Sequence, residues 1–360
     1  MGWARTVAVC CSTAASADPS RIGKIMTDSA DTAPRQAVAH PNIALVKYWG
    51  KADAALNVPA VPSISITLDA LSTRTAVTPA PDLEMDHIRL NGRELDPHSD
   101  EARRIVACLD RLRAIAGRRT SARVESSNDF PTGAGLASSA SGFAALVVAA
   151  AAAFGLELPA CEASKLARAG SASAARSLFG GFAELPVGGV GEDVSARALA
   201  DADHWPLEVV VAICTEAAKE TGSTRGMLDS AATSPFYPAW VATAAEDADM
   251  ARTAIARRDF AALAAVTEAS CLKMHAVMQT TRPALIYWNP ATLATLERMR
   301  DLKAAGAEVC FTMDAGPQVK AICAPGHGAD VLAALSDVPG VHRVLHSRLG
   351  GPARLEPPES

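Results

Sequence analysis

A chain of 360 residues is long enough for two hydrophobic cores, and its 49% hydrophobic and 20% charged residues are typical of globular proteins. The formal net charge of -5 and the 4% aromatic content provide neither the basic stripe nor the aromatic platform of a nucleic-acid-binding protein. A local cluster of Lys and Arg can still bind an anionic small molecule. We therefore expect two domains and a small-molecule ligand, and no nucleic acid.

The cysteines exclude a zinc motif. They stand at positions 10, 11, 108, 161, 214, 271, 310 and 323, and no C-x-x-C pair occurs among them. Most have apolar neighbours, which is typical of reduced core residues in a cytoplasmic protein. We therefore expect a cytoplasmic protein whose cysteines are not paired.

The first 35 residues form a region of their own. A short apolar patch at 6–15 follows Arg5, and a polar stretch comes after it. A signal peptide needs a more uniformly apolar core than this patch, which contains two cysteines. We expect residues 1–35 to be a disordered or dispensable extension, with Met1 and Met26 as alternative starts.

Residues 36–205 are predicted to form an N-terminal domain. The segment 63–69 alternates apolar and polar residues, and we expect 72–78 to continue an antiparallel meander from it. The pair Asn91-Gly92 predicts a hairpin. The predicted elements are strands at 37–51, 63–69, 72–78, 88–90 and 122–126, and helices at 101–116 and 160–178.

A stretch of small residues, 128–142, opens directly into an apolar run. Gly133 and Gly135 let the backbone turn tightly, and Ser138 and Ser139 supply hydroxyls where a helix is predicted to begin. The free amides and the positive dipole end of such a helix attract an anion such as a nucleotide phosphate. No Lys follows the glycines, so this is not a P-loop. The apolar run that follows is rich in alanine, and this composition favours a helix buried in a domain over a membrane span.

Residues 206–352 are predicted to form a C-terminal domain, which opens with a strong strand over 205–213. The segments that follow alternate between helical and strand patterns in a βαβ-like order, and residues 353–360 are predicted as a tail. The predicted elements are helices at 237–278, with a turn at 257–259, at 289–303 and at 328–335, and strands at 309–313, 319–323 and 341–345.

One cluster, Lys47, Tyr48, Trp49 and Lys51, places two cations and two amphipathic aromatics directly after the first strand. A solvated strand end is the simpler interpretation. A lysine and a tyrosine hydroxyl can also clamp phosphate oxygens, because they combine a point charge with a directional donor.

Two further segments are candidates for chemistry. Ser173 and Arg176 share a face if their segment is helical, and an arginine there either binds a carboxylate or lies on the surface. Asp314 lies between a strand and a Gly-Pro turn, where a carboxylate either caps the turn or serves a substrate hydroxyl in phosphoryl transfer. Residues 221–227 are predicted as a flexible loop, and His275 as a packing or capping residue.

Together these segments resemble one known family in their order along the chain and in their residues. The stretch after residue 130 resembles the phosphate-binding loop of the GHMP kinase superfamily, and the whole set is similar to the diphosphomevalonate decarboxylases over residues 37–325. The segments that carry the resemblance are 41–51, 131–140, 170–182, 221–227 and 314–317. The chain departs from the family pattern at Val61-Pro62-Ser63, Ala172, Ala175 and Gln318.

The resemblance implies a two-domain α+β fold of the GHMP kinase type. Its N-terminal domain would be like ribosomal protein S5, its C-terminal domain would be a ferredoxin-like α/β sandwich, and ATP and substrate would meet in a cleft between them. It also implies an enzyme that uses ATP and Mg²⁺ to phosphorylate the 3-hydroxyl of 5-diphosphomevalonate. Loss of that phosphate and of carbon dioxide would then give isopentenyl diphosphate. A homodimer is implied as well.

The resemblance also implies roles for individual residues. The implied catalytic residues are Asp314, Arg176 and Ser139, and Ser138 and Ser139 are the implied Mg²⁺ ligands. The implied substrate-binding residues are Tyr48, Trp49, Lys51, Ser171, Ser173, Arg176, Thr224 and Met227. The implied nucleotide-binding residues are Pro131, Gly133, Gly135, Leu136, Ala137, Ser138 and Ser139.

Three alternatives stay open at this point. The substrate could be 5-phosphomevalonate or mevalonate, because Lys51 favours a diphosphate without requiring one. Asp314 could act as a base or as an orienting group. A ligand sensor of the same fold without enzyme activity is a third interpretation, although such a protein would have no need of Asp314 or the loop serines.

Overall fold

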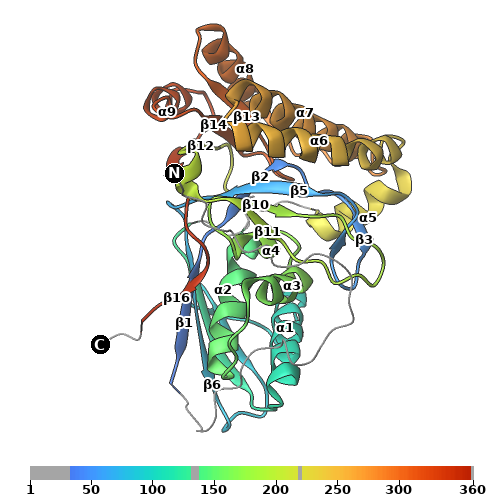
Figure 1. Ribbon diagram of the computed structural model, residues 1–360, viewed down its shortest axis with the longest axis vertical. Coiled ribbons are helices and arrows are strands. Elements are labelled where there is room, and N and C mark those ends of the chain that lie inside the picture. Colours follow the sequence, from blue (N-terminus) through green and yellow to red (C-terminus); the bar gives the residue numbers. More distant parts are fainter. Residues whose placement is uncertain (1–32, 131–137, 218–220, 358–360) are drawn as a thin grey trace, which may run out of the picture.

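A computed structural model describes residues 33–130, 138–217 and 221–357 of the chain. The N-terminal domain is built on a sheet with the strand order β16-β1-β6-β9-β7-β8. Helix α2 lies against β1 and β6, and α1 and α3 pack beside it around one apolar core (Figure 1). The strands are β1 (Arg35–Ala39), β6 (Thr73–Pro79), β7 (His87–Leu90), β8 (Arg93–Glu94), β9 (Ala122–Asn128) and β16 (Arg354–Leu355), and the helices are α1 (Asp100–Ala116), α2 (Ser138–Ala153) and α3 (Ala160–Gly170).

A second, four-stranded sheet lies between the two domains (Figure 1). Helices α6 (Tyr237–Arg257) and α7 (Phe260–Gln279) of the C-terminal domain contact its strand β2, while the short helix α4 (Ala174–Ser177) contacts β10. The strands, in spatial order, are β11 (Arg197–Ala200), β10 (Phe182–Leu185), β5 (Ser63–Thr67) and β2 (Asn42–Val46). A small hairpin of β3 (Lys51–Asp53) and β4 (Val58–Pro59) follows β2.

The predicted meander from 63–69 into 72–78 is wrong. Strand β5 pairs with β2 and β10, whereas β6 pairs with β1 and β9 in the other sheet. All five residues of β5 are buried, so its apolar and polar alternation does not separate a core face from a solvent face. Its serines are buried among polar partners, which the alternation alone does not reveal.

The C-terminal domain has a four-stranded antiparallel sheet in the order β13-β14-β12-β15. The predicted βαβ-like order is present, because α9 leads from β14 over to β15 with β12 between them. A turn of 3-10 helix at Ala202–His204 precedes β12, ahead of this domain. Its strands are β12 (Glu208–Ile213), β13 (Val309–Thr312), β14 (Val319–Cys323) and β15 (Arg343–Arg348), and its other helices are α5 (Ser223–Thr233), α8 (Pro290–Ala304) and α9 (Gly328–Ser336).

Local signals fix several element ends as predicted. Asn91 and Gly92 both have positive φ in the hairpin between β7 and β8. Arg258 ends α6 in the left-handed region and Asp259 caps α7, so the turn at 257–259 is confirmed. Asn289 forms a capping box with Thr292 at the start of α8.

Two local predictions are wrong. The helix expected over 160–178 is interrupted, because Ser171 is extended and leads the chain out of α3 before α4 begins. The loop expected at 221–227 is helical from Ser223, where Gly222 precedes the first turn of α5. Both differences matter for the site, since each segment contributes residues to the cavity described below.

Helix α7 is long and apolar enough to cross a membrane by length and composition, and half of its most apolar window is buried in the protein. The buried cysteines in the described ranges, which are Cys108, Cys214, Cys271, Cys310 and Cys323, form no disulfide. This agrees with the expectation of unpaired core cysteines.

Candidate active site

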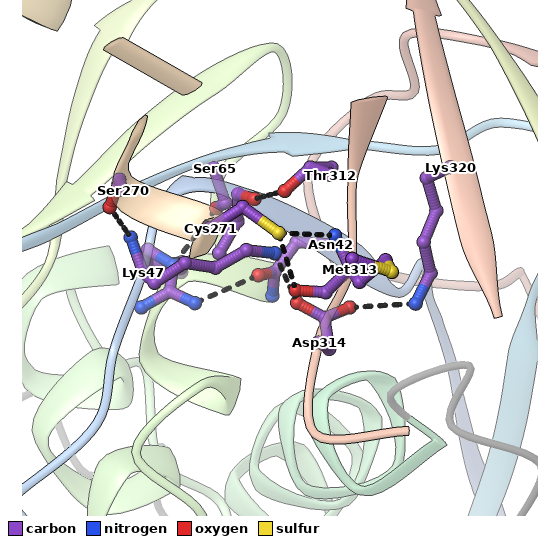
Figure 2. A network of polar contacts seen from close by, with 11 residues as sticks. Asn42, Lys47, Ser65, Ser270, Cys271, Thr312, Met313, Asp314 and Lys320 are labelled. Atoms are coloured by element: carbon purple, nitrogen blue, oxygen red, sulfur yellow. Dashed lines mark hydrogen bonds and ion pairs between the residues drawn. The ribbon is translucent and has the colours of Figure 1, made fainter. Parts of the chain in front are cut away.

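Lys47 directly follows strand β2 and lies at the domain interface. The Lys47 amide donates to Ser270 Oγ at 3.0 Å, and its side chain is 1% exposed (Figure 2). Nζ of Lys47 donates to Oδ1 of Asp314 at 2.7 Å. From the sequence, Lys47 could be identified only as one cation of a cluster. Its partner Asp314 lies 267 positions away, so no local pattern connects the two residues.

Asp314 follows β13 and faces a second lysine. Lys320 on β14 donates from Nζ to Oδ2 of Asp314 at 3.0 Å and is fully buried. Burial alone would raise the pKa of Asp314, but Lys320 and Lys47 outweigh it and hold that pKa well below its ordinary range. Asp314 is therefore an ionised carboxylate with one lysine on each oxygen (Figure 2).

Arg176 lies on α4 with its guanidinium held by neutral side chains. Nε donates to Ser65 Oγ at 2.9 Å, Nη1 to Ser63 Oγ at 2.5 Å and Nη2 to Asn42 Oδ1 at 3.2 Å. Arg176 is 2% exposed, and burial lowers its pKa to about 10. The surface interpretation of Arg176 is wrong. Sequence reasoning missed its three partners, since serines in an alternating strand are usually assigned to solvent.

Asp314 and Arg176 line one large cavity between the domains. Its volume is about 1010 Å³, and Lys47 lines it as well. The remaining sequence-predicted residues of this cavity come from the segment between β2 and β3, from β3 and α5, from the start of α2 and from the segment between α3 and α4, so the fold brings together segments from both domains. They are Tyr48, Trp49, Lys51, Ser139, Ser171, Ser173, Thr224 and Met227.

Lys51 marks a cationic part of the cavity. Its Nζ donates to Asn57 Oδ1 at 2.6 Å and to Thr224 Oγ1 at 3.1 Å. Burial and then the nearby charge of Arg104 lower the pKa of Lys51 to about 8. Arg103, Arg104 and Arg111 of α1 line the same cavity and were missed. Their spacing places all three on one side of a helix, which is a sequence signal for a cationic face. The prediction for this segment used its apolar residues only.

Tyr48 and Trp49 differ in what holds them. The Tyr48 hydroxyl is buried without a hydrogen-bond partner in the described ranges, and burial raises the pKa of this phenol. The Trp49 indole donates to Ser230 Oγ at 3.0 Å, and its ring belongs to an apolar cluster that also contains Met227. Trp49 and Met227 therefore form an apolar wall, whereas Tyr48 offers a polar group.

The predicted nucleotide residues fall partly outside the described ranges: Pro131, Gly133, Gly135, Leu136 and Ala137 do so. Ser138 and Ser139 open α2, and both line a second cavity of about 420 Å³ between α1, α2 and the strands β6, β7 and β9. Ser139 and Arg104 line both cavities, which are therefore adjacent. The hydroxyls of Ser139 and Ser171 are 3.3 Å apart.

His275 is a packing residue, as predicted. It is 1% exposed, and its Nδ1 accepts from the Trp288 indole at 3.0 Å. Burial lowers the pKa of His275 to about 3, so its ring is neutral. Gln318 is also structural, since it bonds the backbone at Cys214 and Thr215. In the described ranges no group of three or more His, Cys, Asp or Glu side chains could hold a metal ion.

Comparison with known proteins assigns both halves of the chain to one family. A model of the diphosphomevalonate decarboxylase-like N-terminal domain matches residues 39–196, and a model of the mevalonate 5-diphosphate decarboxylase C-terminal domain matches residues 209–352. Diphosphomevalonate decarboxylase of Homo sapiens is 39% identical over 299 residues, which cover 77% of this chain and 73% of that protein. Diphosphomevalonate decarboxylase mvd1 of Aspergillus fumigatus is 38% identical over 301 residues, with the same coverage of 77% and 73%.

Solved structures agree with this assignment. Mevalonate diphosphate decarboxylase from Staphylococcus aureus is 35% identical with a TM-score of 0.84. The structure of MDDEF in complex with MVAPP, AMPPCP and magnesium is 36% identical with a TM-score of 0.83. Each match covers 90% of this chain and 98% of the other. The predicted two-domain α+β fold is thus confirmed, and the chain belongs to the diphosphomevalonate decarboxylase family.

Proposed function

We propose that this chain catalyses the ATP-dependent decarboxylation of 5-diphosphomevalonate to isopentenyl diphosphate, in isoprenoid biosynthesis through the mevalonate pathway. The 3-hydroxyl oxygen attacks the terminal phosphorus of ATP, ADP leaves, and the hydroxyl loses its proton. The C3–O bond then breaks as inorganic phosphate leaves, and the electrons of the breaking C1–C2 bond form the C2=C3 double bond while carbon dioxide departs. A tertiary hydroxyl is a poor leaving group, so phosphorylation comes first.

The observation that carries this proposal is that Asp314 and Arg176 line one cavity with Lys51. An ionised Asp314 is suited to accept a hydrogen bond from the 3-hydroxyl. A guanidinium has five N–H donors, and Ser63, Ser65 and Asn42 use three in Arg176. The others are available for the substrate carboxylate.

The cationic part of the cavity supports a diphosphate at the other end of the substrate. Lys51 supplies a point charge, and Arg104 adds a guanidinium that is fixed by a 2.6 Å bond from Nη2 to the Gly170 carbonyl. Tyr48 adds a hydroxyl that has no hydrogen-bond partner among the residues that the structure describes. A diphosphate carries more negative charge than a monophosphate, so this part of the cavity favours 5-diphosphomevalonate over 5-phosphomevalonate.

ATP fits the adjacent second cavity, where α2 begins. Ser138 and Ser139 would bond the nucleotide phosphates, together with the helix dipole. Their hydroxyl oxygens are also of the type that Mg²⁺ binds, and magnesium would offset the charge of the triphosphate. Ser139 lies at the junction with the substrate cavity, where the transferred phosphoryl group must pass.

The experiment measures ADP, inorganic phosphate and carbon dioxide together, with ATP, magnesium and either the monophosphorylated or the diphosphorylated acid. We expect one of each product per turnover, and faster turnover of the diphosphorylated acid. A preference for the monophosphorylated acid would overturn the substrate assignment. Binding without ADP release would identify a sensor and not an enzyme.

We also propose that the protein is a cytoplasmic homodimer that acts on a small molecule, without a membrane or nucleic-acid partner. Its unpaired buried cysteines and its net charge of -5 support this. Light scattering on the eluted protein tests the assembly, and a mass near the 37.2 kDa of one chain would contradict a dimer. Cell fractionation tests the location.

A further inference from the structure

Lys320 lies behind Asp314 and not in the cavity wall. It stands on β14 opposite Thr312 of β13 and Val211 of β12, in the middle of the C-terminal sheet. Lys47 and Asp314 line the cavity, whereas Lys320 reaches the carboxylate from its other side (Figure 2). Lys320 thus touches Asp314 without being placed to touch a substrate.

Five titratable groups surround the Asp314 carboxylate from the elements packed against it. Lys47 comes from the end of β2, Lys320 from β14 and Arg176 from α4, while α7 contributes Cys271 and His275. Burial raises the pKa of the Cys271 thiol and lowers that of His275, so both are neutral. The single negative charge of Asp314 therefore faces three cationic side chains.

We propose that Lys320 is a positioning residue that keeps Asp314 ionised and fixes the rotation of its carboxylate, so that one oxygen stays directed to Lys47 and the cavity. This rests on the proposed function. With one ammonium on each oxygen, the carboxylate cannot rotate without breaking both charge-assisted bonds. Each oxygen still has a free lone pair, so the 3-hydroxyl can bond to it.

Stability alone does not explain Lys320. A fully buried lysine has a large desolvation cost, and an apolar residue of similar volume in a sheet core is often as stable or more stable. Asp314 already has Lys47 as a counter-ion at 2.7 Å. A second buried cation is therefore useful for the state and direction of the carboxylate rather than for the fold.

The first test reads Asp314 directly, without enzyme activity. In protein with ¹³C-labelled aspartates, the Asp314 carboxyl signal is assigned by its loss in Asp314→Asn and followed during acid titration. We expect the wild-type carboxyl to stay ionised at pH 3.8, its ordinary pKa. In Lys320→Met we expect the midpoint to move up by about 1–3 pH units, the effect of one close opposite charge.

The second test reads catalysis. We expect Lys320→Met to lower kcat about 10–100-fold, the scale of a misplaced catalytic group, to move the acid limb of its pH profile upward, and to leave KM for the acid substrate unchanged. Lys320→Arg, which keeps the charge, should restore part of kcat. The matched control is Lys303→Met, which removes a lysine from a surface pair with Glu268 at 2.9 Å. This variant should change neither kcat nor the pH profile.

Two results would overturn the role of Lys320. One is a wild-type Asp314 carboxyl that is half protonated near pH 3.8. This result would show that Asp314 is not kept ionised, and it needs no folded Lys320→Met. The other is a folded Lys320→Met with unchanged kcat and pH profile but a lower melting temperature, which would make Lys320 purely structural. Absence of turnover in the wild type would contradict the proposed function, while the carboxyl titration would still test Lys320.

Discussion

The two charged centres of the cavity are built in opposite ways. Asp314 is held by two cations, so its single negative charge is more than offset within the protein. Arg176 is more deeply buried than Asp314, since 2% of it is exposed against 28% of the Asp314 side chain. Its hydrogen-bond partners in the described ranges are the neutral oxygens of Ser63, Ser65 and Asn42. Arg176 therefore has no direct ion pair in the described ranges, and Asp314, the carboxylate that acts on its charge through space, is already paired with two lysines.

This difference indicates which of the two centres is suited to bind an anion. A substrate carboxylate gains most beside Arg176, where it completes an ion pair, and would be repelled by Asp314. The centre at Asp314 instead suits a neutral hydroxyl. Under the function proposed above, the two centres would hold two polar groups of one substrate apart, with the carboxylate beside Arg176 and the hydroxyl beside Asp314.

Asp314→Asn would break this comparison most severely. Asparagine keeps the shape and one acceptor oxygen but loses the charge, so we expect kcat to fall about 10²–10⁴-fold. The fold should persist with lower stability, because Lys47 and Lys320 both lose their counter-ion. Rates of ADP, phosphate and carbon dioxide formation are measured together on folded protein. Normal ADP formation in step with the acid substrate would show that Asp314 does not serve the hydroxyl.

Arg176→Lys tests the other centre. Lysine keeps the charge but cannot bond three fixed partners and a carboxylate at once, so we expect kcat/KM to fall about 10²-fold. Because the guanidinium is itself built into the site, we also expect the free energy of unfolding to fall by about 1–3 kcal/mol. ATP affinity, measured by titration calorimetry, should stay nearly unchanged. Loss of ATP affinity together with stability would make Arg176 a structural residue only.

Lys51 sharpens the comparison through pH. Its pKa is lowered to about 8, so the free enzyme loses this charge as the pH rises through 8. We expect KM for the diphosphorylated acid to be constant below pH 8 and to rise above it. Lys51→Met should raise KM about tenfold at pH 7, the effect of one charge-assisted bond, and should abolish the rise near pH 8. A wild-type KM that stays flat up to pH 9.5 would contradict the assignment.

Ser65→Ala should have the smallest effect. It removes one of the three neutral partners of Arg176, at 2.9 Å, and we expect a loss of about 1 kcal/mol in stability. Activity should fall less than about threefold, since Ser63 and Asn42 still hold the guanidinium. Denaturant unfolding and KM measure this, with Ser127→Ala, at an exposed position of β9, as the control. A larger activity loss than in Arg176→Lys would place the serine itself against the substrate.

Local patterns in the sequence predicted most helices and strands because their signals are local. Asp259 and Asn289 cap the helices that they precede, and Asn91-Gly92 closes its hairpin. Strand pairing was harder. Residues 63–67 and 73–79 are close in the sequence, yet they belong to different sheets, since a strand buried on both faces gives no sign of its neighbours.

The site residues also differ in whether a local pattern in the sequence reveals them. Asp314 and Arg176 stand in recognisable motifs, so they could be identified as candidates. Lys320 could not, because its role depends on the register that sets it opposite Thr312 at the end of β13. Arg104 was hidden for another reason: its helix was considered only for its apolar face, whereas its guanidinium lines both cavities.

The pairing of β16 with β1 has a consequence for synthesis on the ribosome. Val38 and Ala37 emerge early, whereas Arg354 and Leu355, their partners, are made near the end of the chain. Until then one edge of β1 presents unpaired backbone groups, which are a template for aggregation. The N-terminal sheet is therefore completed only after the whole C-terminal domain has been translated, so a nascent chain stalled in that domain would expose this edge.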